Sequence, residues 1–278
     1  MTALLLLAAL AAHAAPADPQ RIVSAIREFD AHSNDPIPVP KGKDLTELSE
    51  GHLVRIRQVT DPDAPQRVIG LQIFHHTKSE LWVATGDDDY NDVQELHYVD
   101  LKHLPPPAPG HRYLQYLDVP WPFADRYWVI DTWDNLDLVK ATGDRMWENP
   151  WRLVDGGEKL ARKAIRAGKL PGVGAEMLGK AIYTPVNRGA WLAISLDDHA
   201  TLFGYHVTSV VGGAIPDDLV ARYSMHTLRR IFHGAASRFP QILTHYDADH
   251  EPIVGGDDKP IPPFSGGRGG ANTVTASR

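Results

Sequence analysis

Apolar and polar residues alternate along most of this chain with the period of β-strands. Successive side chains of a strand point to opposite faces, so alternation is typical of a strand buried on one side. Together with β-branched runs, it predicts strands over residues 51–59, 66–74, 93–101, 111–119, 126–139, 146–154, 189–196 and 200–211. Strands that follow one another through short turns favour an antiparallel meander.

Helical spacing is confined to a few segments. Apolar residues within 18–29 recur every three or four positions, which predicts a short amphipathic helix. The sequence Thr77-Lys78-Ser79-Glu80 has the form of a capping box and predicts a helix of two to three turns after it. The longest helix is expected over residues 216–239, where Pro216 suits a first-turn position.

The pattern also divides the chain into segments. We expect an N-terminal helix and linker over residues 15–47, a main domain over 48–245, and a disordered tail over 246–278, which is rich in Pro and Gly. Residues 155–185 interrupt the strands with helical spacing and are predicted to be a helical insertion, either a lid over a cavity or a surface excursion.

Composition limits the classes of function. The chain has 278 residues, 43% of them hydrophobic, which suits one main domain. Its formal net charge of −7 offers no basic field for nucleic acid. With no cysteine, it contains neither disulfides nor thiolate chemistry.

The N-terminus has the features of an export signal. Residues 3–12 form an apolar run too short to span a bilayer, and Ala12-His13-Ala14 supplies the small residues of a cleavage site. No Lys or Arg precedes the run, and a buried N-terminal helix is the alternative. We expect a signal peptide over residues 1–14, a secreted or periplasmic protein, and no integral membrane segment after cleavage.

A rigid corner lies within residues 118–131. Two prolines flank Trp121, and each fixes its own φ and lacks an amide proton. The stretch Pro120-Trp121-Pro122-Phe123-Ala124-Asp125-Arg126 resembles the PWP-x-x-DR corner of START domains, the StAR-related lipid-transfer branch of the helix-grip (SRPBCC) superfamily. Residues 211–216 resemble the D-P-G-G-x-x-P segment of that family, but Val211 and the absence of a proline before the glycines depart from it.

The resemblance implies an α+β, helix-grip (START-like) fold, in which a curved antiparallel sheet wraps around the long C-terminal helix. It also implies non-catalytic binding or transport of a lipid or other hydrophobic small molecule in an internal cavity. Transient contact with a membrane is compatible with that role. The insertion at residues 155–185 is not part of the usual domain.

Candidate ligand-binding residues follow from the strands, the last helix and the corner. Alternation places Phe203, Tyr205 and Val207 on one face of a strand, and Leu192 with Ile194 on one face of its neighbour. The full predicted set is Tyr116, Trp121, Arg126, Trp128, Leu192, Ile194, Phe203, Tyr205, Val207, Leu219 and Tyr223. For each of these residues, an ordinary filled core is the alternative.

Arg126 allows two interpretations. Its guanidinium would bind a ligand carboxylate or phosphate through paired donors, or it would form a structural ion pair with Asp125 that stiffens the corner. The structural interpretation is favoured, because charged groups are rarely buried without a partner.

The alternative function is that of a helix-grip cyclase or hydrolase. It requires titratable groups in the cavity, with Arg126, Tyr116, Tyr223 and His206 as candidates, and its test is whether His206 and Tyr223 point into one cavity. The scattered histidines, including His75, His76, His97, His245 and His250, show no metal-ligand spacing. We therefore expect no catalytic residues, no metal and no cofactor.

Overall fold

The protein has an α+β fold built on one large sheet. The computed structural model describes residues 15–59, 64–86, 96–105, 109–121, 123–213, 215 and 217–264. The strands are β1 (Val54–Gln58), β2 (Arg67–Phe74), β3 (Leu96–Leu104), β4 (Gly110–Leu117), β5 (Arg126–Trp133), β6 (Met146–Leu153), β7 (Ile182–Tyr183), β8 (Val186–Ser195) and β9 (Thr201–Val210). The helices are α1 (Pro19–Asp30), α2 (Lys43–Ser49), α3 (Lys78–Gly86), α4 (Leu136–Ala141), α5 (Gly157–Arg166), the 3₁₀ turn η1 (Met177–Gly179) and α6 (Asp217–His245).

The nine-stranded sheet has the order β1-β2-β9-β8-β6-β5-β4-β3, with antiparallel neighbours, and the short β7 pairs in parallel with β5. The predicted antiparallel meander is therefore confirmed for most of the chain. The first strand pair, β1 with β2, is joined to the last pair, β8 with β9, by pairing between β2 and β9, which are far apart in sequence.

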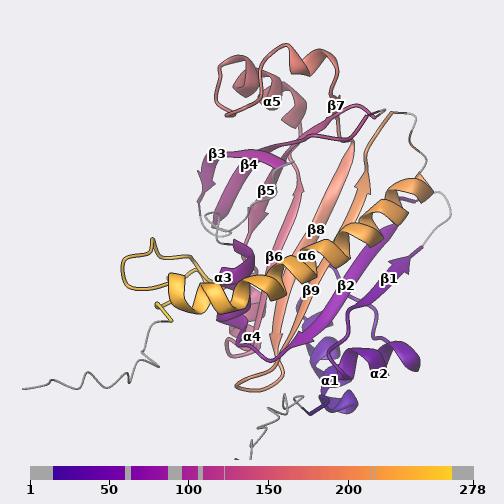
Figure 1. Cartoon of the computed structure of the whole chain (residues 1–278), viewed down its shortest axis with the longest axis vertical. Coiled ribbons are helices and arrows are strands. Elements are labelled where there is room, and N and C mark those ends of the chain that lie inside the picture. The colour runs from indigo at the N-terminus through magenta and orange to yellow at the C-terminus, as the bar shows by residue number, and fades with distance from the viewer. Residues whose placement is uncertain are drawn as a thin grey trace, which may run out of the picture.

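Helices cover both sides of the sheet. Helix α6 crosses one side diagonally, and α3 lies beside its C-terminal half; we call this side the α6 face (Figure 1). The opposite side, the α1 face, packs Ile22, Ile26 and Phe29 of α1 against sheet residues such as Leu71 and Leu202.

Close contact between α6 and the sheet depends on Gly70 of β2. A Cβ at this position would lie 2.8 Å from Cε2 of Phe232 and 3.2 Å from Cδ2 of Leu228. The missing side chain lets the helix backbone approach the strand more closely than any larger residue would allow. Helix α6 packs mainly against α3, β1, β2 and β9.

The capping box predicted before α3 is confirmed. The backbone amide of Glu80 donates to Thr77 Oγ1 at 3.2 Å, and the amide of Thr77 donates to Glu80 Oε2 at 2.9 Å. These reciprocal bonds satisfy two amides that a helix start leaves without partners.

The insertion over residues 155–185 packs its helix α5 on the β4–β5 part of the α1 face. Ala161, Ala164 and Ile165 of α5 pack against Tyr127 and Val129 of β5. Cross-strand pairs connect this side of β5 to β9, because Asp131 pairs with Arg152, Arg152 with Arg188, and Arg188 with Thr208. Thr208 lies on the same side of β9 as Leu202, so α5 and α1 pack on the same side of the sheet. The insertion is therefore not a lid over the α6 face, because its helix packs on the other side of the sheet.

The prediction of disorder from residue 246 onward is wrong for residues 246–264. Tyr246 is 1% exposed, its hydroxyl donates to the Ile261 carbonyl at 2.7 Å, and it accepts from the Ile253 amide at 2.9 Å. The buried Tyr246 thus orders a loop whose composition alone predicts disorder. Residues 1–14 and 265–278, where the signal peptide and the rest of the tail are predicted, lie outside the described residues.

Candidate ligand-binding face

Strand register divides the predicted lining residues between the two faces of the sheet. Phe203 pairs with Ala193, and Tyr205 pairs with Trp191, so Trp191 shares the α6 face with them. Leu192 and Ile194 project to the α1 face, where they pack in the same cluster as α1. Their predicted place beside Phe203, Tyr205 and Val207 is wrong, because the neighbouring strand presents the other half of its side chains to α6.

Aromatic side chains line the α6 face between β9 and β6. Ring centroids lie 4.5 Å apart for Trp191 and Tyr205, 5.3 Å for Trp151 and Tyr205, and 5.5 Å for Trp191 and Phe203. We call Trp151, Trp191, Phe203 and Tyr205 the aromatic wall. Two of its members, Trp151 and Trp191, were absent from the predicted set, although alternation along their strands gives each of them one definite face.

Tyr205 is the polar member of this wall. Its side chain is half-buried, yet burial raises the pKa of its hydroxyl well above the usual value, and desolvation is the single cause. Tyr205 therefore combines partial exposure with strongly desolvated surroundings. Val207, the next residue on this face, is also half-buried.

Trp128 and Tyr116 lie on opposite sides of the sheet. Trp128 is on the α6 face, where its Nε1 donates to Gln115 Oε1 at 2.6 Å. Tyr116 is fully buried on the α1 face and donates its hydroxyl to Asp125 Oδ2 at 2.7 Å. Burial and this carboxylate raise the pKa of Tyr116 above its usual range. Tyr116 therefore does not line the α6 face as predicted.

Arg126 fastens the corner to the segment that leads into α6. Its guanidinium is 3% exposed and donates to the carbonyls of Val211 at 2.6 Å and Gly212 at 3.0 Å, and to those of Ala124 and Asp125. Burial lowers the pKa of this guanidinium. The structural interpretation is supported, but the partners are backbone carbonyls rather than the Asp125 carboxylate.

The Asp125 carboxylate has a separate role in the corner. Besides accepting from Tyr116, it accepts from the backbone amide of Val119 at 3.0 Å. Asp125 thus holds the strand end before the corner, while Arg126 holds the glycine pair beyond β9. The two sequence motifs that were noted separately are in direct contact.

Three predicted lining residues are exposed at the end of the molecule where α6 begins. The exposed fraction is 91% for Trp121, 45% for Leu219 and 56% for Tyr223, and their neighbour Phe123 is 43% exposed. We call these four residues the end patch. None of them is enclosed between α6 and the sheet.

The enzyme alternative required His206 and Tyr223 to converge, and they do not. His206 is fully buried on the α1 face, where its Nδ1 lies 3.8 Å from Asp35 Oδ2. Burial, followed by Arg67 and Arg188, lowers the pKa of His206 well below its usual value, so its imidazole is neutral. Tyr223 lies on the exposed surface of α6.

Comparison with known proteins identifies the fold. No protein-family model matches the sequence, and no curated protein matches it. Among solved structures, human STARD10 superposes with a TM-score of 0.52 at 12% identity, covering 76% of this chain and 79% of that chain. The chain has a START-like fold.

Two further solved structures are similar to this chain at lower TM-scores. Human StAR-related lipid transfer protein 5 has a TM-score of 0.49 at 11% identity, covering 80% of this chain and 96% of that one. A STAR-related lipid transfer protein from Xanthomonas axonopodis has a TM-score of 0.48 at 14% identity, covering 68% and 94%. The order of the strands and helices, together with the superposition on human STARD10, confirms the predicted α+β helix-grip architecture.

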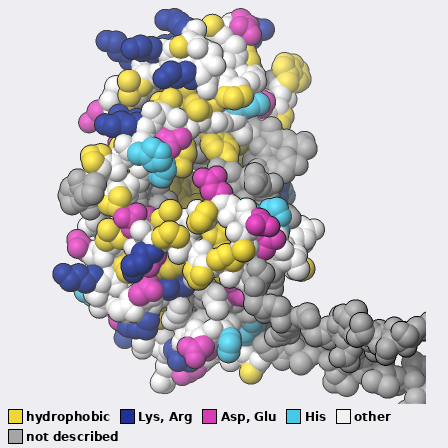
Figure 2. Space-filling model, turned by 90° about the vertical axis from the view of Figure 1, so that its left-hand side faces the viewer, with side chains coloured by type: hydrophobic (Ala, Val, Ile, Leu, Met, Phe, Trp, Pro, Cys, Tyr) yellow, Lys and Arg dark blue, Asp and Glu magenta, His cyan; other side chains and the backbone are white. Residues whose placement is uncertain are grey.

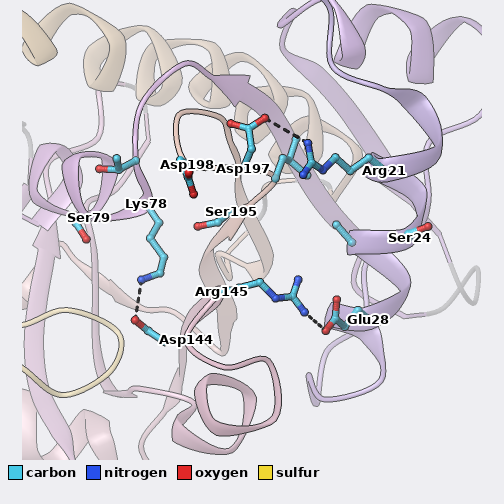
Figure 3. A pocket seen from close by; sticks show the side chains of 13 residues that line it. Arg21, Ser24, Glu28, Lys78, Ser79, Asp144, Arg145, Ser195, Asp197 and Asp198 are labelled. Carbon is cyan, nitrogen blue, oxygen red and sulfur yellow. Dashed lines mark hydrogen bonds and ion pairs between the residues drawn. The ribbon is translucent and has the colours of Figure 1, made fainter.

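A groove of this START-like chain lies at the sheet end nearest α1. The groove encloses about 580 Å³ between α1, the start of α3 and the β8–β9 turn (Figure 3). Its cations are paired with its anions: Arg21 with Asp197 at 3.4 Å, Lys78 with Asp144 at 3.2 Å, and Arg145 with Glu28. Such a lining of paired charges does not suit an apolar guest.

Apolar side chains also gather on the side of the molecule that carries the β3 edge. Figure 2 shows hydrophobic side chains around a hollow in the middle of this side. None of the helices in the described part of the chain is long and apolar enough to cross a membrane.

Proposed function

We propose that this protein binds a lipid or another hydrophobic small molecule between α6 and the sheet, without covalent chemistry. The observation that carries the proposal is the aromatic wall, in which Tyr205 and Trp191 are half-buried and the Tyr205 hydroxyl is strongly desolvated. Ligand sites are typically concave and apolar, with few polar groups that fix the orientation of the guest. The START-like fold supports this role by analogy.

The wall suggests how a guest is oriented. Its aromatic rings offer apolar contact area, and Tyr205 adds one hydroxyl in desolvated surroundings. A hydrogen bond to such a group is stronger than one in water, and an unpaired hydroxyl there costs free energy. The proposed guest therefore has an apolar body and at least one polar group that meets the Tyr205 hydroxyl.

Adjacent residues on opposite faces provide a matched test. We expect Trp191→Leu to weaken binding of a fluorescent nitrobenzoxadiazole-labelled fatty acid by roughly tenfold or more, because the ring contributes directly to the wall. Leu192→Val, one position along on the α1 face, should leave the affinity within about twofold. Tyr205→Phe should weaken binding without destabilising the fold. Equal affinities for Trp191→Leu and Leu192→Val, or no binding by the wild type, would refute the proposal.

The end patch is the proposed site of transient membrane contact. Trp121, Phe123, Leu219 and Tyr223 are brought to one end of the molecule by the contacts of Arg126 with Val211 and Gly212. Tryptophan and tyrosine favour the membrane–water interface, where an apolar ring meets a polar layer. With a net charge of −7, contact would depend on apolar insertion rather than on attraction to anionic lipids.

Vesicle sedimentation tests the membrane contact. Trp121→Ser combined with Phe123→Ser should reduce the fraction bound to phosphatidylcholine vesicles. The control is Leu160→Ser, which changes an exposed apolar residue on α5. Equal binding by both variants would show that the end patch does not make the contact.

Export remains part of the proposal. The apolar run over residues 3–12 and the small residues up to Ala14 support a cleaved signal peptide. The mass of the exported protein should correspond to a chain that begins at Ala15, and an exported chain that retains Met1 would contradict cleavage.

A further inference from the structure

Two histidines and an aspartate meet on the β3–β4 hairpin. His103 of β3 and His111 of β4 are paired across the two strands, and their ring centroids lie 4.5 Å apart. Asp100 Oδ2 is 2.6 Å from His111 Nδ1 and 3.8 Å from His103 Nε2. One possible ligand atom from each residue lies within 4.8 Å of the others.

A β-bulge brings the third side chain to this place. The strand register shifts between Asp100 and Lys102, so that Leu101 is an extra residue. In a regular strand, positions 100 and 103 point to opposite faces, whereas the extra residue turns Asp100 and His103 to the same side. The amide of Lys102 donates to Asp100 Oδ1 at 2.8 Å, which leaves Oδ2 toward the histidines.

The three side chains combine ligand types that suit zinc. Imidazole nitrogen and carboxylate oxygen bind Zn²⁺ at about 2.0–2.2 Å, and three protein ligands leave one position open. We propose that Asp100, His103 and His111 form a binding site for Zn²⁺ or a similar divalent transition-metal ion. Small rotations of the two imidazole rings would bring one nitrogen of each within bonding distance of the same ion.

The surroundings of the site are accessible and negatively charged. The side chain of His103 is 81% exposed and that of His111 is 38% exposed, so an ion from solution reaches both rings. Asp134 interacts electrostatically with His111, which places its carboxyl near the rings. A second carboxylate near the rings favours a cation over an anion.

The site lies on the same side of the sheet as the α6 face. Cross-strand pairing links His103 and His111 to Thr132, Trp151, Gly189 and Val207 in one row across the sheet. Because Trp151 belongs to the aromatic wall, the open position of a bound ion would lie on the same side of the sheet as that wall. Water or an anionic group of a small molecule would complete the coordination.

Zinc binding is measured directly on the full chain. After treatment with a chelator, the protein should take up one Zn²⁺ per chain in competition with the chromophoric chelator 4-(2-pyridylazo)resorcinol. His103→Gln combined with His111→Gln should lower the affinity at least about tenfold, and so should Asp100→Asn alone.

The control removes the same number of histidines elsewhere. His199→Gln combined with His226→Gln changes two exposed residues and should keep the wild-type affinity. Circular dichroism of each variant establishes that it is folded, and Asp100→Asn keeps the test decisive if the double histidine variant is not. The proposal is overturned if the wild type binds no Zn²⁺ tighter than about 100 μM, or if Asp100→Asn and the control bind equally well.

Discussion

A single arginine determines how the corner and the last helix are joined. The Arg126 guanidinium is buried and donates to carbonyls on both sides of the junction, including those of Val211 and Gly212. A planar guanidinium reaches several acceptors at once, whereas an ammonium on a flexible stem does not. Arg126 therefore stabilises this junction through hydrogen bonds to main-chain carbonyls.

We predict that Arg126→Lys destabilises the protein by about 2–4 kcal/mol, because buried carbonyls lose charged donors. Urea unfolding measures the loss. Arg27→Lys, at an exposed position of α1, is the control and should change the free energy of unfolding by less than about 0.5 kcal/mol. A similarly small effect of Arg126→Lys would contradict the structural role.

The carboxyl of Asp134 gives a prediction about how the stability of the protein depends on pH. Burial raises the pKa of its carboxyl from 3.8 to about 6, so the native state binds more protons than the unfolded state between about pH 4 and pH 6. Its contribution to stability therefore falls as the pH rises through this window. Asp134→Asn should stabilise the protein by about 1–3 kcal/mol at pH 8 and change it little at pH 4.5.

Urea unfolding at the two pH values, with a chelator present, tests this expectation. Asp249→Asn, an exposed substitution, is the control for the loss of one negative charge. An effect of Asp134→Asn that is equal at pH 4.5 and pH 8 would contradict the assigned pKa.

At the scale of elements, the sequence predicted most strands and helices but not which faces meet. Alternation identifies residues that share a face within one strand, yet cross-strand register decides which face turns toward α6. Leu192 and Ile194 were misplaced for this reason, while Trp191 was missed. Register is set by contacts between distant segments, which a single sequence does not display.

Other features of the site cannot be recognised from a short stretch of sequence. The partners of Arg126 are main-chain carbonyls, which every residue carries, and the bulge at Leu101 cannot be recognised from residue types. The order of residues 246–264 depends on Tyr246 and its two backbone partners, whereas Pro and Gly content alone indicated disorder. The corner and capping box were predictable because their geometry requires particular residues in a short span.

The contact of α6 with β2 carries a prediction about elements. Gly70→Val would place atoms against Phe232 and force the helix away from the sheet, at a cost of about 1–3 kcal/mol. Gly179→Ala, where an added Cβ meets no atom within 4 Å, is the control. Urea unfolding should show that Phe232→Ala costs less in the Gly70→Val background than alone. Additive effects would indicate that the two residues do not share this contact.

At the scale of the whole molecule, the two faces of the sheet differ. Helices α1, α2 and α5 pack on the α1 face, while α6 packs mainly over β1, β2 and β9 on the other. The aromatic wall lies on the same face as α6, on β9, β8 and β6, and the ring centroid of its Phe203 is 6.0 Å from that of Phe232 on α6. The proposed binding of a guest relies on this arrangement, with the end patch as the proposed point of entry from a membrane.

Native mass spectrometry of the exported full-length protein, followed by solvent extraction of anything bound, tests the central claim most directly. The account predicts an apolar guest at one molecule per chain, retained by Leu192→Val and lost or depleted in Trp191→Leu. A wild-type protein that is empty, and that binds none of a panel of fatty acids, phospholipids and sterols, would contradict it.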